Sequence, residues 1–158
     1  MSVDQNQVLW HNLRKKSLTD LFFFAKAIMG FSWLNEKIHM PLCRLLEAYT
    51  ENPRLKIVLP RGWLKTTLCS QAYPVWRAIR NPNIRIVLAQ NTYSNAVSKL
   101  KVIRATFEKN TLFCWLFPEL LPDAGCTWKS ESLCIKRSGP HYQSFFLLGQ
   151  TRLQMIPS

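Results

Sequence analysis

Carboxylates are scarce in this chain of 158 residues. Asp and Glu together number 9 against 21 Lys and Arg, so the formal net charge is +12. The aspartates are Asp4, Asp20 and Asp123. A hydrolase that relies on two or three clustered acids therefore has few candidate residues here. The excess of positive charge instead favours a polyanionic partner, either a nucleic acid or an anionic membrane surface.

The sequence also has no long apolar run and no closely spaced cysteine pair. Its most apolar stretch, residues 21–34, contains Lys26 and is shorter than the roughly 20 residues that a membrane span needs. The N-terminus carries Asp4 and does not show the basic and then apolar segments of a secretion signal. Because no apolar run is long enough to span a membrane, we expect no membrane association. The five cysteines include no CxxC pair, so they indicate neither a zinc site nor a disulfide framework, and we expect a reducing compartment.

What is present is the composition of a folded domain with helices near its start. An apolar fraction of 47% excludes intrinsic disorder, and the length suits one domain with a core. Residues 1–17 are polar and then basic, and we expect them to form a flexible lead-in. Thr19 or Asp20 can cap a helix that follows, and a second helix is predicted from about Pro41 to Tyr49.

Two short runs rich in β-branched residues predict buried strands, and a helical pattern follows each of them. The predicted strands are 56–59 and 84–89, and the predicted helices are 65–80 and 93–109. Strands that alternate with helices favour a parallel sheet with helices on its faces, so the predicted fold class is α/β. Towards the C-terminus, residues 133–137 and 144–148 predict a small β hairpin.

Residues 59–67 connect the first predicted strand to the helix that follows it. In the phosphate-binding pattern GxxxxGK[ST], Lys65 and Thr66 match, whereas the two glycines fall on Leu59 and Leu64. Such a loop holds a phosphate chain with the backbone amides of a helix N-terminus, a lysine that reaches the β- and γ-phosphates, and a hydroxyl that binds Mg²⁺. From the pattern alone, the segment is either such a loop or an ordinary strand-to-helix turn with a solvated Lys-Thr pair.

The order of residues in this loop resembles a known motif. Pro60-Arg61-Gly62-x-x-Lys65-Thr66-Thr67 resembles the deviant Walker A motif of the large terminase subunits of tailed bacteriophages, the ATPases that pump DNA into procapsids. In that family an arginine precedes the lysine by a few residues, and the second glycine is often replaced. Residues 86–110 resemble the strand and helix that come next, residues 39–47 the helix before the motif, and residues 128–137 the segment before Walker B. The resemblance covers residues 18–149.

This resemblance implies a partial P-loop ATPase of the RecA/ASCE type that binds ATP and Mg²⁺. It implies that Lys65 contacts the β- and γ-phosphates, that Arg61 stabilises charge on the γ-phosphate, and that Thr66 coordinates Mg²⁺. Lys65 and Arg61 are thus the catalytic candidates. The implied nucleotide-binding set is Pro60, Arg61, Gly62, Trp63, Leu64, Lys65, Thr66 and Thr67.

Two further pairs of polar residues have two interpretations each. Asn35 and His39 lie where the family places adenine contacts, or they belong to a polar helix face. Gln90 and Thr92 follow a predicted strand, and they either contact substrate or cap the next helix.

The chain departs from the family where an acidic Walker B strand is expected. After Thr67 no apolar run ends in an acid that could serve. Asp123 directly follows a proline, which does not suit a central strand, and residues 150–158 do not resemble the family continuation. The resemblance therefore predicts an incomplete ATPase domain over 18–149, followed by a tail foreign to the family. Such an amino-terminal fragment binds nucleotide at most, and whether it is an enzyme stays open.

For the complete protein, the resemblance implies packaging of viral double-stranded DNA in the cytoplasm of a bacterial host. It also implies a homo-oligomeric ring that works with a small terminase subunit and a portal protein. The alternative is a small basic nucleic-acid-binding α/β protein that uses no nucleotide. Its support is the charge of +12 and two basic clusters, which equally occur as solvated helix surfaces. These clusters comprise Lys99, Lys101 and Arg104 on a predicted helix and Arg77, Arg80 and Arg85 around a turn.

Overall fold

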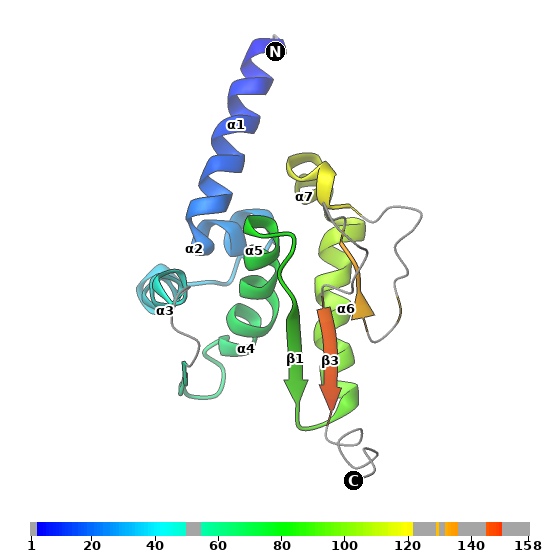
Figure 1. The fold of residues 1–158 in the computed structure, drawn as a ribbon. Helices are drawn as coiled ribbons and strands as arrows, with labels where there is room; N and C mark the ends of the chain where they lie inside the picture. Colours follow the sequence, from blue (N-terminus) through cyan, green and yellow to red (C-terminus); the bar gives the residue numbers. More distant parts are fainter. Residues whose placement is uncertain (1–2, 50–54, 122–128, 130–131, 136–144, 150–158) are drawn as a thin grey trace. The chain divides into compact units, whose positions relative to one another are not determined.

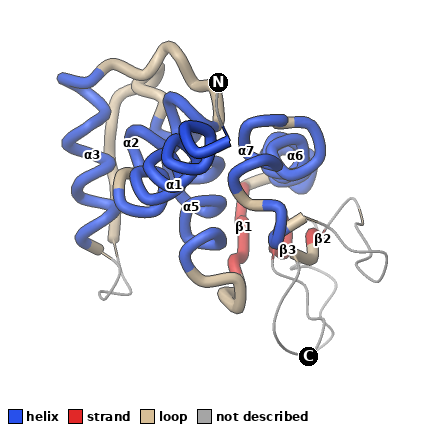
Figure 2. Tube along the Cα trace, turned by 90° about the horizontal axis from the view of Figure 1, so that it is seen from above, coloured by secondary structure: helices blue, strands red, loops and turns tan. Residues whose placement is uncertain are grey.

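The structure, a computed structural model, describes residues 3–49, 55–121, 129, 132–135 and 145–149 (Figure 1). These residues are mostly helical, as the tube drawing also shows (Figure 2). Their elements in chain order are α1 (Val3–Thr19), α2 (Leu21–Phe23), the π-helix η1 (Phe24–Ile28), α3 (Glu36–Ala48), α4 (Lys65–Thr67), the π-helix η2 (Leu68–Ala72), α5 (Tyr73–Arg80), β1 (Ile86–Gln90), α6 (Tyr93–Lys109), α7 (Thr111–Leu116), the 3-10 helix η3 (Pro118–Leu120), β2 (Ser132–Leu133) and β3 (Phe145–Gly149).

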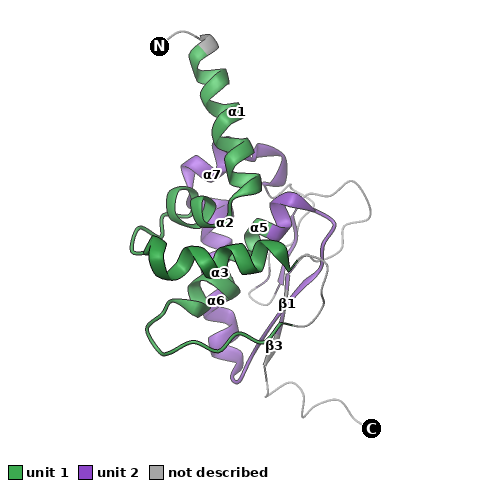
Figure 3. Ribbon diagram, turned by 90° about the vertical axis from the view of Figure 1, so that its left-hand side faces the viewer, with its two compact units in different colours: residues 1–76 green, residues 77–158 purple. Residues whose placement is uncertain are grey.

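The chain divides into two compact units, residues 1–76 and residues 77–158 (Figure 3). The boundary falls within α5. Unit 1 holds α1 to the first half of α5, and its described elements are all helical. Unit 2 holds the end of α5 together with the described strands. The loop at residues 59–67 thus belongs to unit 1, and the sheet belongs to unit 2.

Unit 1 begins with a helix where the sequence predicted a flexible lead-in. α1 covers residues 3–19, and its end is held by the Trp76 indole, whose Nε1–H donates to the Ser17 carbonyl at 3.0 Å. This long-range contact was not visible in the local sequence pattern. The next helix starts as predicted, because Asp20 Oδ1 accepts a hydrogen bond from the Phe23 amide at 2.8 Å. α2 then continues directly into η1.

α3 begins at Glu36, earlier than the predicted start at Pro41. Asn35 caps it, since its Oδ1 accepts a hydrogen bond from the Lys37 amide at 2.9 Å. Pro41 lies inside the helix, where it has no N–H to donate to the Lys37 carbonyl. The helix tolerates this loss because one face is firmly packed. The buried residues of that face are His39, Leu42, Cys43 and Leu46.

One continuous helical segment begins at Lys65, within the 59–67 loop, as the sequence predicted. α4, η2 and α5 run without interruption from Lys65 to Arg80. The apolar side chains of Leu68, Ala72 and Trp76 on this segment are buried. Its middle part has π-helical hydrogen bonding, a geometry that often occurs near functional sites. The loop is therefore attached to a well-anchored helix.

In unit 2 a small sheet packs against α6. The strand order is β1-β3-β2, with β1 and β3 parallel and β2 and β3 antiparallel. α6 contacts β1 and β3, and the ring centroids of Phe107 on α6 and Phe145 on β3 lie 6.4 Å apart. The predicted bounds of this helix, Tyr93 to Lys109, are confirmed. Its predicted inward residues are buried: Ala96, Leu100, Ile103 and Phe107.

The predicted fold class is wrong. An α/β protein with a parallel P-loop sheet was expected, but the described residues are mostly helical, and the sheet among them has short strands and one parallel pair. Residues 56–59, predicted as a strand, have no regular secondary structure, and Val58 is 76% exposed. A β-branched run forms a strand only where its backbone groups find a partner strand. No described residue pairs with this run. Residues 136, 137 and 144 of the predicted hairpin lie outside the described part.

Candidate functional site

The 59–67 loop lines a hollow at the start of the helical segment that ends at Arg80. The hollow has a volume of about 390 Å³, and the described residues that line it are those of the loop itself. The helix begins at Lys65. The first backbone amides of a helix have no acceptor within the helix, so residues 65–67 of the loop carry such amides. The structure therefore brings the whole predicted nucleotide-binding set, from Pro60 to Thr67, around one hollow.

The backbone of this loop is left-handed at two positions. Gly62 has a φ of +86°, which glycine adopts without steric cost. Leu64 has a φ of +49° and a ψ of 20° directly before the helix starts. For a residue with a Cβ atom this conformation costs about 1–2 kcal/mol. Leu64 occupies the second glycine position of GxxxxGK[ST], so a leucine here adopts a conformation that glycine would favour.

Two cations lie in this loop without a carboxylate to balance them. Arg61 is exposed and Lys65 is half-buried, and the segment from 59 to 67 contains no Asp or Glu. Within the described part of the chain, neither side chain takes part in an ion pair. Positive side chains beside the start of a helix attract anions, because the first amides add their own partial positive charge. The loop thus has the electrostatics of an anion site.

The remaining loop side chains leave the hollow open to solvent. Thr66 is exposed and Thr67 is half-buried, and neither hydroxyl hydrogen-bonds to a described residue. Trp63 is 42% exposed. The Thr66 hydroxyl is therefore free to bind a cation that a phosphate chain carries. This chemistry fits Mg²⁺ together with a polyphosphate, and the remaining metal ligands would be phosphate oxygens and water.

The pair Asn35 and His39 has a structural role in α3. The Asn35 side chain is the helix cap, and His39 is 5% exposed, with the Asn35 amide donating to its Nδ1 at 2.8 Å. His39 Nε2 is buried and has no hydrogen-bond partner within the part of the chain that the structure describes. The pair does not form a solvated polar face. A contact between these residues and adenine stays a prediction.

The pair Gln90 and Thr92 belongs to unit 2, whereas the 59–67 loop belongs to unit 1. Thr92 Oγ1 accepts a hydrogen bond from the Asn95 amide at 3.3 Å and caps α6. The capping interpretation of Thr92 is therefore confirmed. Gln90 is half-buried at the end of β1.

The described residues include neither a cluster of possible metal ligands nor a membrane-spanning helix. They contain no group of three or more His, Cys, Asp or Glu side chains that could hold a metal ion. Asp123 lies outside the described part, so the structure has no bearing on it as a magnesium ligand. Over that same part, no helix has both the length and the apolar character that crossing a membrane requires.

Two cysteines of unit 1, Cys43 and Cys69, are poor nucleophiles. Cys43 is fully buried, and burial together with the nearby carboxylates of Glu47 and Asp20 raises the pKa of its thiol to about 12. Burial also raises the pKa of Cys69, although the Lys65 ammonium acts in the opposite direction. A high thiol pKa disfavours the reactive thiolate. In unit 1 the cations are therefore better candidates for binding or catalysis than these two thiols.

Sequence reasoning missed a balanced charge network in unit 1, here named the Arg44 network. Its members are Asp20, Arg44 and Glu47, and Arg44 donates to a carboxylate oxygen of each acid. The spacing of Arg44 and Glu47 on one helix was a usable signal, but the contact with Asp20 joins distant parts of the chain. Sequence reasoning also missed the left-handed Leu64, which the mismatch at the consensus glycine could have indicated.

Comparison of the chain with models of known protein families, with curated proteins and with solved structures gave no match.

Proposed function

We propose that the 59–67 loop binds the phosphate chain of a nucleoside triphosphate together with Mg²⁺. The observation that carries this proposal is the hollow of about 390 Å³ at a helix start, lined by Arg61 and Lys65 with no balancing carboxylate in the loop. Two neighbouring cations without a carboxylate partner repel each other and so destabilise the folded loop. An anionic ligand bound between them relieves this repulsion. The proposal concerns the loop alone and requires no P-loop sheet.

Each loop side chain has a proposed role. Lys65 contacts the β- and γ-phosphates, Arg61 neutralises charge on the γ-phosphate, and the Thr66 hydroxyl is a ligand of Mg²⁺. The amides at the start of the helix, which lack internal acceptors, donate to phosphate oxygens. Mg²⁺ would supply charge neutralisation between neighbouring phosphate groups.

At the level of the whole protein, we propose that this chain is the amino-terminal part of a terminase large subunit. The support is the sequence motif from Pro60 to Thr67 and the clustering of those residues around one hollow. The complete protein would package viral double-stranded DNA in a bacterial cytoplasm, as a ring with a small terminase subunit and a portal protein. The chain itself is proposed to bind ATP without turning it over.

Calorimetric titration of the full chain with Mg-ATP and with Mg-pyrophosphate tests the loop assignment. Lys65→Ala should weaken binding roughly tenfold or more, because a hydrogen bond to a charged group contributes about 1.5–3 kcal/mol. Lys56→Ala is the matched control, since Lys56 is an exposed lysine of the same unit outside the hollow. Absence of binding by the wild type at millimolar ligand, or equal loss in both variants, would overturn the proposal.

A steady-state ATPase assay addresses catalysis separately. The expected result is no turnover above background at saturating Mg-ATP. Turnover that Lys65→Ala abolishes and Lys56→Ala preserves would show that the chain is catalytically complete. In that case this chain would itself hydrolyse the ATP that the proposed packaging role requires.

Nucleic-acid binding without nucleotide is the second candidate, and the net charge of +12 favours it. Part of the predicted basic cluster is already engaged, since Arg104 donates to the Lys129 carbonyl at 2.6 Å and its Nε lies 4.0 Å from a Glu108 carboxylate oxygen. Lys101 on the same helix is exposed. A titration with double-stranded DNA should show a steep salt dependence and indifference to Mg-ATP if this candidate is correct. A response to Mg-ATP favours the nucleotide proposal.

A further inference from the structure

Leu64 joins the loop to the helix, and its backbone determines how the helix begins. It is half-buried, and among the described non-glycine residues it is the one with a positive φ. Its carbonyl accepts a hydrogen bond from the Leu68 amide at 3.0 Å, so the first helical turn is built on it. The peptide that leads into Lys65 takes its direction from this left-handed residue. The orientation of the Lys65 and Thr66 amides therefore depends on the conformation of Leu64.

A leucine resists the conformation that this position has. Residues with a Cβ atom rarely adopt a positive φ, whereas glycine adopts it about as readily as a negative one. Molecules in which residue 64 leaves the left-handed region would turn the amides at the helix start away from their present direction. The apparent affinity of a site is reduced by the fraction of molecules in the competent state. Residue 64 is thus placed to control that fraction.

We propose that Leu64 is a positioning residue for phosphate binding, whose left-handed backbone sets the fraction of molecules able to receive a phosphate chain. This inference rests on the proposed nucleotide binding by the 59–67 loop. The backbone conformation of residue 64 determines phosphate affinity. The side chain affects this affinity only because it determines how readily the residue adopts a positive φ. Substitutions at this position should consequently rank by that tolerance and not by size or hydrophobicity.

Three substitutions separate backbone tolerance from packing. Leu64→Gly removes the Cβ atom and accepts a positive φ freely. Leu64→Ala keeps the Cβ atom but loses the packing of the half-buried side chain. Leu64→Ile keeps the apolar volume but adds a branch at Cβ, which makes a positive φ a true outlier. Dissociation constants for Mg-ATP and Mg-pyrophosphate are measured by calorimetry on the full chain, and urea unfolding of each variant is measured in the same buffer.

The expected affinities do not follow the expected stabilities. Leu64→Gly should bind roughly fivefold more tightly than Leu64→Ala, and Leu64→Ile roughly fivefold more weakly than the wild type. Leu64→Ala should unfold at lower urea concentration than the wild type yet bind within about twofold of it, because both residues carry a single unbranched Cβ atom that disfavours a positive φ. A purely structural role of Leu64 predicts instead that affinity falls together with stability.

Equal affinities of the Gly and Ala variants, or wild-type affinity of Leu64→Ile, would overturn this inference. If Leu64→Ile does not fold, the Gly and Ala pair decides by itself. Lys65→Ala distinguishes the two proposals. If the wild type binds neither ligand, or if Lys65→Ala binds as the wild type does, the proposed function fails and the inference fails with it. If Lys65→Ala loses binding while the Leu64 variants bind alike, the inference alone fails.

Discussion

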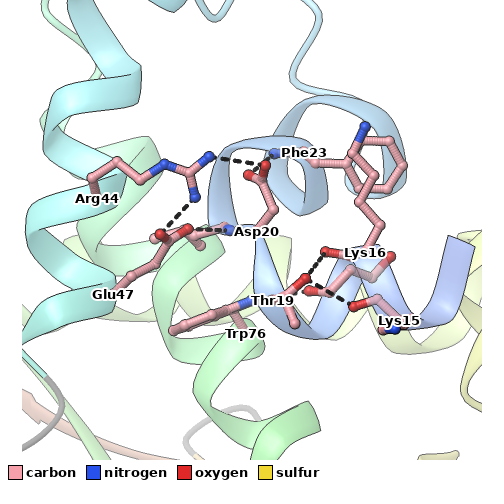
Figure 4. A network of polar contacts seen from close by, with 10 residues as sticks. Lys15, Lys16, Thr19, Asp20, Phe23, Arg44, Glu47 and Trp76 are labelled. Atoms are coloured by element: carbon pink, nitrogen blue, oxygen red, sulfur yellow. Dashed lines mark hydrogen bonds and ion pairs between the residues drawn. The ribbon is translucent and has the colours of Figure 1, made fainter.

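Unit 1 contains two groups of cationic side chains that differ in how their charge is balanced. In the Arg44 network, Arg44 donates to Glu47 Oε2 at 2.7 Å and to Asp20 Oδ2 at 3.1 Å (Figure 4). In the 59–67 loop, Arg61 and Lys65 share a hollow to which no described residue contributes a carboxylate. The same residue types are thus neutralised in one place and left uncompensated in the other.

The carboxylates of the Arg44 network are used on both oxygens. Glu47 Oε1 accepts the Leu21 amide at 2.6 Å, and Asp20 Oδ1 accepts the Phe23 amide at 2.8 Å. The hydrogen bonds that Arg44 donates to Glu47 and Asp20 also raise the pKa of Arg44. Arg44, whose carboxylate partners lie on α3 and at the start of α2, therefore serves to join these two helices. A charge without partners is available to a ligand, and this contrast separates a structural cation from a candidate functional one.

The largest expected effect lies beside the Arg44 network, at Trp76. This side chain is 1% exposed, and its Nε1–H donates to the Ser17 carbonyl. Trp76→Ala should lower the free energy of unfolding by about 3–5 kcal/mol through loss of buried apolar surface and a residual cavity. Trp76→Phe keeps most of the ring and is the matched control, with a smaller loss. Urea unfolding measures both, and a cost below about 1 kcal/mol for Trp76→Ala would contradict the view of this region as the stable part of unit 1.

Glu47 is the next position, because it connects two elements at once. Its side chain is 15% exposed, and it accepts from Arg44 and from the Leu21 amide. Glu47→Ala should cost about 2–3 kcal/mol, since it leaves the Leu21 amide without its acceptor and removes one of the two carboxylates that Arg44 binds. Glu47→Gln keeps an oxygen for the Leu21 amide and should cost less. Equal losses for Ala and Gln in chemical denaturation would show that the charge, and not the acceptor, determines the stability.

The thiol of Cys43 reports on the same network through pH. Burial first, and then the charges of Glu47 and Asp20, raise the pKa of Cys43 to about 12. The folded state therefore keeps this proton where the unfolded thiol, with a pKa of about 8.5, has already lost it. Its contribution is fully present below about pH 8.5 and is lost between there and pH 12, by about 1.4 kcal/mol for each pH unit. Cys43→Ala should show a shallower decline in unfolding experiments over this range, and identical slopes would contradict the prediction.

The parts of the fold that the sequence predicted well depend on local chemistry. The α6 pattern places apolar residues on one face from Ala96 to Phe107, and these residues are buried. The cap at Asp20 and the helical segment from Lys65 to Arg80 also follow from short-range signals. In each case the information lies within a few residues, so no distant partner had to be known.

The failures depend on distant partners or on backbone angles. Residues 56–59 have the composition of a strand, but strand formation requires a second strand that the run itself cannot specify. Pro41 suggested a helix start, yet Asn35 provided an earlier cap. The motif identified the residues of the candidate site, whereas the left-handed Leu64 breaks the usual preference of its residue type, which is where sequence rules are expected to fail.

The smallest expected effect tests the comparison directly, by removing one cation from each group. Arg44→Ala should cost about 0.5–1 kcal/mol, because its ion pairs are partly exposed and surface pairs contribute little. Lys65→Ala should change the free energy of unfolding by less than about 0.5 kcal/mol, because no carboxylate in the loop depends on it. Added salt should reduce the effect of Arg44→Ala by screening its pairs. Urea unfolding of both variants at low and high salt measures the difference. A larger loss for Lys65→Ala than for Arg44→Ala would mean that Lys65 has a structural partner, and the distinction between structural and available charge in unit 1 would no longer hold.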